Sequence, residues 1–154
     1  MRADGAPDGP PDGGYGLRDA GPGDAAEIAR VMGDWCREVA WLPKLHTRDA
    51  DLAFVRGLLA THVVRVGFAG GMGFLARRGV EVTALYLAPE ARGKGLGKAL
   101  LEEAKAMGRL ELWAFQANHG ARAFYRREGF GEVRFTDGAD NDEKLPDVRL
   151  EWVG

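Results

Sequence analysis

The sequence has little cysteine, no long apolar run and no excess of one charge, and each absence excludes a class of protein. A single cysteine, Cys36, rules out an internal disulfide framework. No apolar stretch approaches the roughly 18 residues of a membrane span, and the first residues lack the basic-then-apolar pattern of a signal peptide. The formal net charge is only −2, with both signs mixed along the chain. We therefore expect a cytoplasmic protein that binds neither a membrane nor nucleic acid.

The 154 residues fit one domain, which at this size buries roughly 70% of the surface that the unfolded chain exposes. The first 14 residues are almost all Gly, Pro, Asp and Ala, and such a composition cannot bury enough apolar surface to offset chain entropy. We predict a disordered tail over residues 1–14 and a single domain over residues 15–154.

Hydrophobic spacing predicts the elements of this domain. The apolar residues between Ile28 and Val39 recur every three or four positions after a turn that ends at Asp24, which indicates a helix capped by Asp24 with Cys36 in its buried face. Further helices are expected over residues 49–61, 95–106 and 119–127. Strands are expected over residues 15–20, 62–69, 72–77, 80–87, 110–115, 132–136 and 148–152. The middle three strands read as an antiparallel meander joined by glycine turns.

The segment most informative about function is a β-type run that enters the glycine-rich stretch Arg92-Gly-Lys-Gly-Leu-Gly97 and then an amphipathic helix. Gly93, Gly95 and Gly97 let the backbone approach a phosphate, and the free N–H groups at the helix start favour an anion. Arg92, Lys94 and Lys98 add positive charge. A Walker loop would need Gly at position 92 and a hydroxyl residue at position 99, and a dinucleotide fingerprint would need Gly at position 98. A tight strand-to-helix turn is the structural alternative.

This stretch resembles the Arg/Gln-x-x-Gly-x-Gly/Ala acetyl-CoA signature of the GNAT superfamily. The segment Asn118-His-Gly-Ala-Arg-Ala-Phe-Tyr-Arg-Arg-Glu-Gly-Phe130 resembles the family's second signature at a consistent spacing. Residues 41–47 and 136–147 resemble a bacterial subgroup of that family, for which no acceptor is inferred. The resemblance implies an α/β (α+β) GNAT fold, with a mixed, mostly antiparallel twisted sheet of about seven strands flanked by about four helices.

The resemblance also implies an acetyl-CoA-dependent N-acetyltransferase that transfers acetyl to a primary amine of a small molecule or peptide. Leu85 would donate its backbone N–H to the thioester carbonyl, Leu87 would pair with the pantetheine arm, and Asn118 would contact the cofactor or serve as a helix cap. Tyr125 would protonate the departing thiolate, with an ordinary aromatic role as the alternative. A rival of another class is a non-catalytic module that binds coenzyme A or a partner protein.

Attack requires a neutral amine, and Glu81 is a candidate base. It precedes Leu85 by four residues on one predicted strand, so we expect it on the same face; a solvated glutamate beside a turn is the alternative. The resemblance places the acceptor pocket at the first two helices and the last strands, which points to Trp35, Trp41 and His46. It also points to the acidic loop residues Asp140, Asp142 and Glu143, for which a solvated surface loop is the alternative. The histidines show no metal-ligand spacing, so no metal is expected. The protein is expected to be a monomer or a homodimer.

Overall fold

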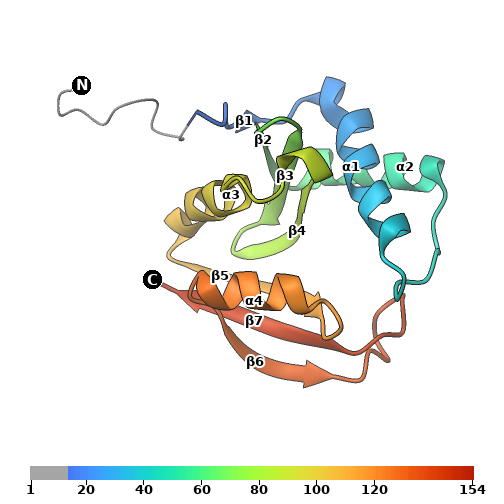
Figure 1. Cartoon of the computed structure of the whole chain (residues 1–154), viewed down its shortest axis with the longest axis vertical. Coiled ribbons are helices and arrows are strands. Elements are labelled where there is room, and N and C mark those ends of the chain that lie inside the picture. Colours follow the sequence, from blue (N-terminus) through green and yellow to red (C-terminus); the bar gives the residue numbers. More distant parts are fainter. Residues whose placement is uncertain (1–13) are drawn as a thin grey trace.

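The computed structural model describes residues 14–154, in which seven strands form one open sheet (Figure 1). The strands are β1 (Arg18–Asp19), β2 (Val63–Phe68), β3 (Met72–Arg78), β4 (Glu81–Leu87), β5 (Arg109–Phe115), β6 (Gly131–Thr136) and β7 (Asp147–Val153). Their order is β1-β2-β3-β4-β5-β7-β6, and every neighbouring pair is antiparallel except β4 and β5. The mixed, mostly antiparallel sheet is the predicted one. The predicted tail lies outside the described residues except for Gly14.

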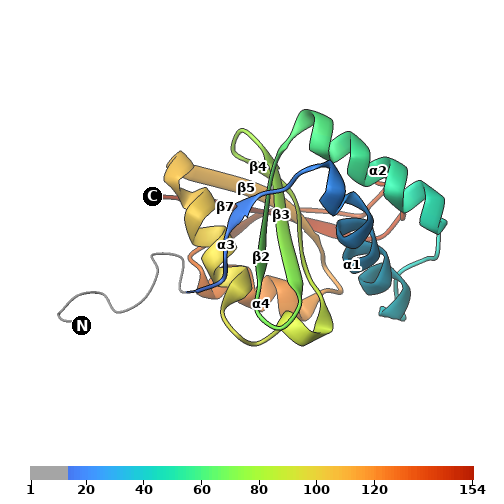
Figure 2. The same cartoon turned by 90° about the horizontal axis from the view of Figure 1, so that it is seen from above.

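Four α-helices cover the two faces of the sheet: α1 (Ala25–Glu38), α2 (Arg48–Thr61), α3 (Leu96–Ala104) and α4 (His119–Arg127). Figure 2 shows α1 and α2 on one side of β2, β3 and β4, with α3 on the other. Two apolar clusters result. One joins α1 and α2 to the face that carries Phe74, Ala84 and Tyr86, called here the α1 face. The other joins α3 and α4 to the face that carries Leu75 and Leu85, called here the α3 face.

The predicted boundaries hold within three residues, and three local features differ from the prediction. The predicted first strand shortens to Arg18–Asp19. Asp24 does not cap α1 with its side chain; a 3-10 turn (Pro22–Asp24) comes first, and the Asp24 carboxylate accepts a hydrogen bond from the Gly21 N–H at 2.8 Å. The helix predicted to end at residue 106 ends at Ala104 and tightens into a 3-10 turn, because Gly108 takes a left-handed φ of +84°.

A β-bulge in β4 decides which side chains meet at the centre of the molecule. Successive β3 residues Ala76 and Arg77 pair with Ala84 and Val82, so Thr83 is an extra residue in β4. Cross-strand partners point to the same face, so Val82 lies with Leu85 on the α3 face. The alternation that a sequence pattern assumes is therefore interrupted between Glu81 and Leu85.

The two central strands separate soon after they begin. Within the described chain, β4 and β5 are joined by one residue pair, Glu81 with Glu111, and by the hydrogen bond from the Glu111 N–H to the Val80 carbonyl at 2.9 Å. Beyond that point the parallel strands splay apart. β5 is instead paired along its whole length with β7, from Arg109 opposite Val153 to Phe115 opposite Asp147. The splay leaves one edge of β4 without a partner strand.

Candidate active site

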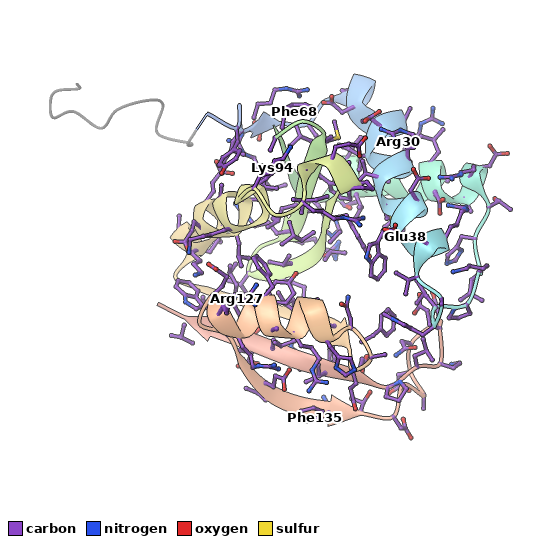
Figure 3. The ribbon with its side chains drawn as sticks, viewed as in Figure 1. Arg30, Glu38, Phe68, Lys94, Arg127 and Phe135 are labelled. Carbon is purple, nitrogen blue, oxygen red and sulfur yellow. The ribbon has the colours of Figure 1, made fainter. Side chains whose placement is uncertain are left out.

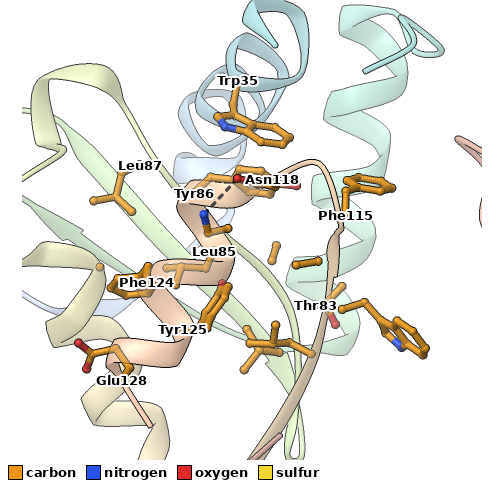
Figure 4. Close-up of a pocket in the computed structure, with 18 of the residues that line it drawn as sticks. Trp35, Thr83, Leu85, Tyr86, Leu87, Phe115, Asn118, Phe124, Tyr125 and Glu128 are labelled. Atoms are coloured by element: carbon orange, nitrogen blue, oxygen red, sulfur yellow. Dashed lines mark hydrogen bonds between the residues drawn. The ribbon is translucent and has the colours of Figure 1, made fainter. Parts of the chain in front are cut away.

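A pocket of about 1120 Å³ occupies the space where β4 and β5 diverge. Strand pairing assigns its lining to the two faces of the sheet, so the pocket passes through the sheet. Figure 4 shows Tyr125 directed toward Leu85, with Trp35, Tyr86 and Phe115 at the other end. The α3-face part is lined by Leu85, Leu87, Leu112, Ala114, Phe124 and Tyr125, and the α1-face part by Trp35, Tyr86, Trp113, Phe115, Arg134 and Asp147.

The glycine loop forms one wall of the pocket as the start of α3. Gly93 and Gly95 take left-handed φ angles of +72° and +85°, which side-chain-bearing residues rarely adopt. No described atom lies within 4 Å of a Cβ built on Gly93. Among the described residues no side chain caps α3, so its first-turn N–H groups are available to an anion. Gly93, Gly95 and Gly97 all line the pocket, as the sequence predicts for a phosphate cradle.

The basic residues of the loop are divided between the pocket and the surface. Arg92 and Lys98 line the pocket. Arg92 is held by Glu38 at 2.8 Å and by the Leu87 carbonyl at 3.2 Å, and Lys98 is paired with Glu128 at 3.1 Å. Lys94 does not line the pocket, because its ammonium turns toward the Ala69 carbonyl at 3.3 Å (Figure 3). The structure thus does not bring the predicted Lys94 side chain into the site.

The free edge of β4 presents backbone groups to the pocket. The Ala88 N–H donates to Met72 of β3 at 2.8 Å, and backbone groups alternate in direction along a strand. The N–H groups of Leu87 and Leu85 therefore point away from β3, into the gap that β5 leaves. Both residues line the pocket, where the resemblance places the cofactor contacts.

Tyr125 lies on α4 at the α3-face side of the gap. Its side chain is only 8% exposed and packs against Phe124 and Phe130, with ring centroids 5.2 and 5.4 Å away. Within residues 14–154 its hydroxyl has no hydrogen-bond partner. Burial raises the pKa of this phenol, so Tyr125 is a neutral donor at pH 7. At the start of the same helix, Asn118 both lines the pocket and caps α4 by accepting from the Ala121 N–H at 3.1 Å.

The position predicted for Glu81 is wrong. The Thr83 bulge turns Glu81 to the face opposite Leu85, and Glu81 is not among the pocket residues. Its carboxylate pairs with Arg149 at 3.0 Å, and Arg149 also binds Glu111. Burial raises the pKa of Glu81, while Arg149 opposes that shift.

The residues predicted for the acceptor end are only partly brought together. Trp35 lines the pocket, and its ring lies 5.3 Å from Tyr86. Trp41 stands behind it, 6.2 Å from Trp35 and 5.6 Å from Phe115, so it braces the pocket wall. His46 is exposed on the α1–α2 connection outside the pocket.

The acidic loop between β6 and β7 reaches the pocket through two of its three predicted carboxylates. Asp142 is exposed and outside the lining, whereas Asp140 and Glu143 line it. Tyr86 and Phe115 also line the pocket and were not predicted. Alternation along β4 and β5 could have identified Tyr86 and Phe115 as opposite-face neighbours of Leu85 and Ala114, but no sequence signal selects Glu143 over Asp142.

Two further observations on the described residues concern metal binding and membrane-spanning helices. Between residues 14 and 154 no group of three or more His, Cys, Asp or Glu side chains is placed to hold a metal ion. No helix in that range is long and apolar enough to cross a membrane.

Comparison with known proteins places these features in a family. Residues 57–132 match the model of the acetyltransferase (GNAT) domain. The chain is 40% identical over 68 residues to an uncharacterized N-acetyltransferase of Methanocaldococcus jannaschii, covering 40% of this chain and 30% of that protein. It is 31% identical over 84 residues to the peptidyl-lysine N-acetyltransferase YjaB of Escherichia coli, covering 54% of this chain and 57% of YjaB. The chain thus spans 30% and 57% of the lengths of these relatives.

Solved structures extend the likeness to nearly the whole chain. The solution structure of apo YjaB aligns with 91% of this chain and 98% of its own, at a TM-score of 0.69 and 25% identity. A phosphinothricin acetyltransferase from Sinorhizobium meliloti in complex with AcCoA shares the fold at a TM-score of 0.67 and 22% identity, covering 91% of this chain and 88% of that one. With its splayed β4 and β5, its glycine cradle and the matching family model, the chain belongs to the GNAT superfamily of acetyltransferases.

Proposed function

We propose that this protein is an acetyl-CoA-dependent N-acetyltransferase that transfers acetyl to a primary amine by direct attack in a ternary complex. The observation that carries the proposal is the free edge of β4 facing a pocket. The pocket also holds the glycine cradle and a buried tyrosine whose hydroxyl has no partner among residues 14–154. Support comes from the fold shared with a structure in complex with AcCoA. It also comes from the similarity to YjaB, which is named a peptidyl-lysine N-acetyltransferase. A cytoplasmic location and a monomeric or dimeric state stay predictions from the sequence.

The residues present fit the proposed cosubstrate. The pyrophosphate would rest on the N–H groups at the start of α3, near Arg92 and Lys98. The pantetheine arm would lie along the free edge of β4, paired with Leu87. When bound, acetyl-CoA supplies an acetyl group activated as a thioester. The Leu85 N–H would then stabilise the negative charge that develops on the carbonyl oxygen, as an oxyanion-hole donor.

Proton handling completes the proposed role of the chain. An amine with a pKa of about 10.4 is mostly protonated at pH 7 and must lose a proton before attack, a penalty of roughly 4 to 5 kcal/mol. Tyr125 would give its phenolic proton to the departing sulfur and recover one from the new amide nitrogen, so that one proton per turnover is released to solvent. Because Glu81 is held by Arg149 outside the pocket, it has no part in this proposal.

The test is a coupled assay on purified protein with acetyl-CoA and a panel of primary amines. Thiol release is followed with a chromogenic reagent, and the acetylated amine is identified by mass spectrometry. We expect the two products in equal amounts with at least one amine. Binding of acetyl-CoA without acetylation of any amine would contradict catalysis and favour the rival, a non-catalytic module that binds coenzyme A.

A further inference from the structure

Strands β6 and β7 and the loop between them bring three carboxylates to the pocket, those of Asp140, Glu143 and Asp147, together with the guanidinium of Arg134. The Asp147 carboxylate accepts hydrogen bonds from the Thr136 hydroxyl and from the Asn141 amide. By contrast, no ion pair or hydrogen bond to the Glu143 carboxylate is found in the described part of the chain.

The loop that carries Glu143 is closed by hydrogen bonds of the Asn141 side chain. The Asn141 amide donates to the Leu145 carbonyl at 2.8 Å and accepts from the Leu145 N–H at 3.2 Å. The Lys144 ammonium, although adjacent in sequence, turns away from Glu143 to the Ala139 carbonyl at 2.8 Å. The half-buried Glu143 therefore lines the pocket without a cation partner among residues 14–154.

Aromatic side chains line the same pocket as this carboxylate, among them Trp35 and Tyr86. Burial is the main cause of the raised pKa of the Tyr86 phenol, with smaller contributions from Cys36, Tyr125 and, last, Glu143. Burial likewise raises the pKa of the Cys36 thiol, with smaller contributions from Asp51 and Glu143. Tyr86, whose ring packs on Trp35, lines the pocket together with Glu143. A pocket that combines a carboxylate with tyrosine and tryptophan side chains is a favourable environment for an ammonium group.

The reacting nitrogen has a different requirement. It must be neutral when it attacks, and a fixed carboxylate in contact with it would stabilise its protonated form. The second marker in the pocket is the Tyr125 hydroxyl, buried to 8% exposure, unpartnered among residues 14–154 and directed into the α3-face part. The reacting thioester therefore belongs beside Tyr125 and Leu85, and the Glu143 end is left for another group of the acceptor.

We propose that the acceptor is a small diamine: one nitrogen attacks beside Leu85 while the second stays protonated and binds Glu143 against Trp35 and Tyr86. This inference rests on the proposed acetyltransferase function. Glu143 is on this account a specificity-determining residue that contacts the non-reacting end of the substrate.

The experiment compares diamines with monoamines of equal chain length: 1,3-diaminopropane with propylamine, 1,4-diaminobutane with butylamine, and 1,5-diaminopentane with pentylamine. Two equivalent amines give a diamine a statistical advantage of two in kcat/KM. We expect at least a tenfold advantage for one or more of these lengths. In Glu143→Gln the advantage should fall to what the statistical factor and the lower pKa of the diamine nitrogens supply, because both persist in the variant; the difference from the wild type measures the part that depends on Glu143.

Asp142→Asn is the matched control, because Asp142 is an exposed carboxylate of the same loop outside the pocket. It should retain the diamine preference, and both variants should keep the wild-type melting temperature and acetyl-CoA stabilisation. Equal kcat/KM for diamines and monoamines, or an undiminished preference in Glu143→Gln, would overturn this inference and leave the proposed function standing. A protein that acetylates neither series would overturn this inference, whereas the proposed function is contradicted only if no amine of the wider panel is acetylated.

Discussion

Replacing Tyr125 with phenylalanine removes one hydroxyl from the centre of the pocket. The ring is 8% exposed and keeps its packing against Phe124 and Phe130 in the variant. Because the hydroxyl has no hydrogen-bond partner among residues 14–154, its removal breaks no bond of the folded chain. We expect the free energy of unfolding to change by less than about 0.5 kcal/mol, and acetyl-CoA to bind as before.

The expected effect of Tyr125→Phe falls on the chemical step. General acid catalysis typically contributes about 10² to 10⁴ in rate. A thiolate whose conjugate acid has a pKa of about 8.5 is already a moderate leaving group, so the lower end of that range applies. We therefore predict a loss in kcat of about 100-fold, or about 2.7 kcal/mol in activation free energy.

The pH profile provides a second readout for Tyr125. Burial raises the pKa of this phenol above its ordinary value near 10, so its protonated form persists over a wider alkaline range. Loss of the Tyr125 proton should therefore cause no decline in wild-type kcat below about pH 10. The assay is single-turnover acetylation, where chemistry limits the rate. Full kcat in Tyr125→Phe under those conditions would refute the acid role.

Two further pairs of variants test the scaffold, with unfolding in urea as the measurement. Gly95→Ala places a Cβ at a φ of +85° and should destabilise the protein by about 1 to 2 kcal/mol. Its control is Gly57→Ala, inside α2, where no described atom lies within 4 Å of the added Cβ. This change should stabilise the protein by about 0.5 to 1 kcal/mol. Equal effects would contradict the strain assigned to the cradle. Asp51→Asn weakens the ion pair between the buried Asp51 carboxylate and Arg37, in which Oδ2 and Nη1 are 2.8 Å apart. It should cost about 1 to 3 kcal/mol, and the partial hydration of Arg37 limits that cost. The exposed Asp49→Asn should change stability by less than about 0.5 kcal/mol, and an equal cost for both would contradict the role of burial.

Local signals in the sequence predict the fold and the cofactor end of the site. The spacing of Gly93, Gly95 and Gly97 corresponds to the left-handed turns and the start of α3. The second family signature corresponds to α4 over the predicted residues, with Asn118 at its cap and Tyr125 facing the pocket. These features depend on residues close together in the chain, so a single sequence is sufficient to find them.

The acceptor end depends on contacts that the sequence does not encode locally. One extra residue at Thr83 places Glu81 on the opposite face of the sheet. Neither Thr83 nor the residues around it form a sequence pattern that predicts a bulge. The choice of Glu143 over Asp142 is set by the Asn141 hydrogen bonds within the loop. His46 lies outside because Arg37 holds its carbonyl at 3.0 Å, away from the pocket.

The central claim is that acetyl-CoA binds in the gap between β4 and β5, and thermal unfolding with added ligand tests it most directly. A ligand at 100 times its Kd adds about 2.7 kcal/mol of stability, which raises the melting temperature by roughly 5 to 10 °C in a domain of this size. The account predicts such a shift with acetyl-CoA and none with ATP or NADH. No shift with acetyl-CoA, or an equal shift with ATP, would contradict it.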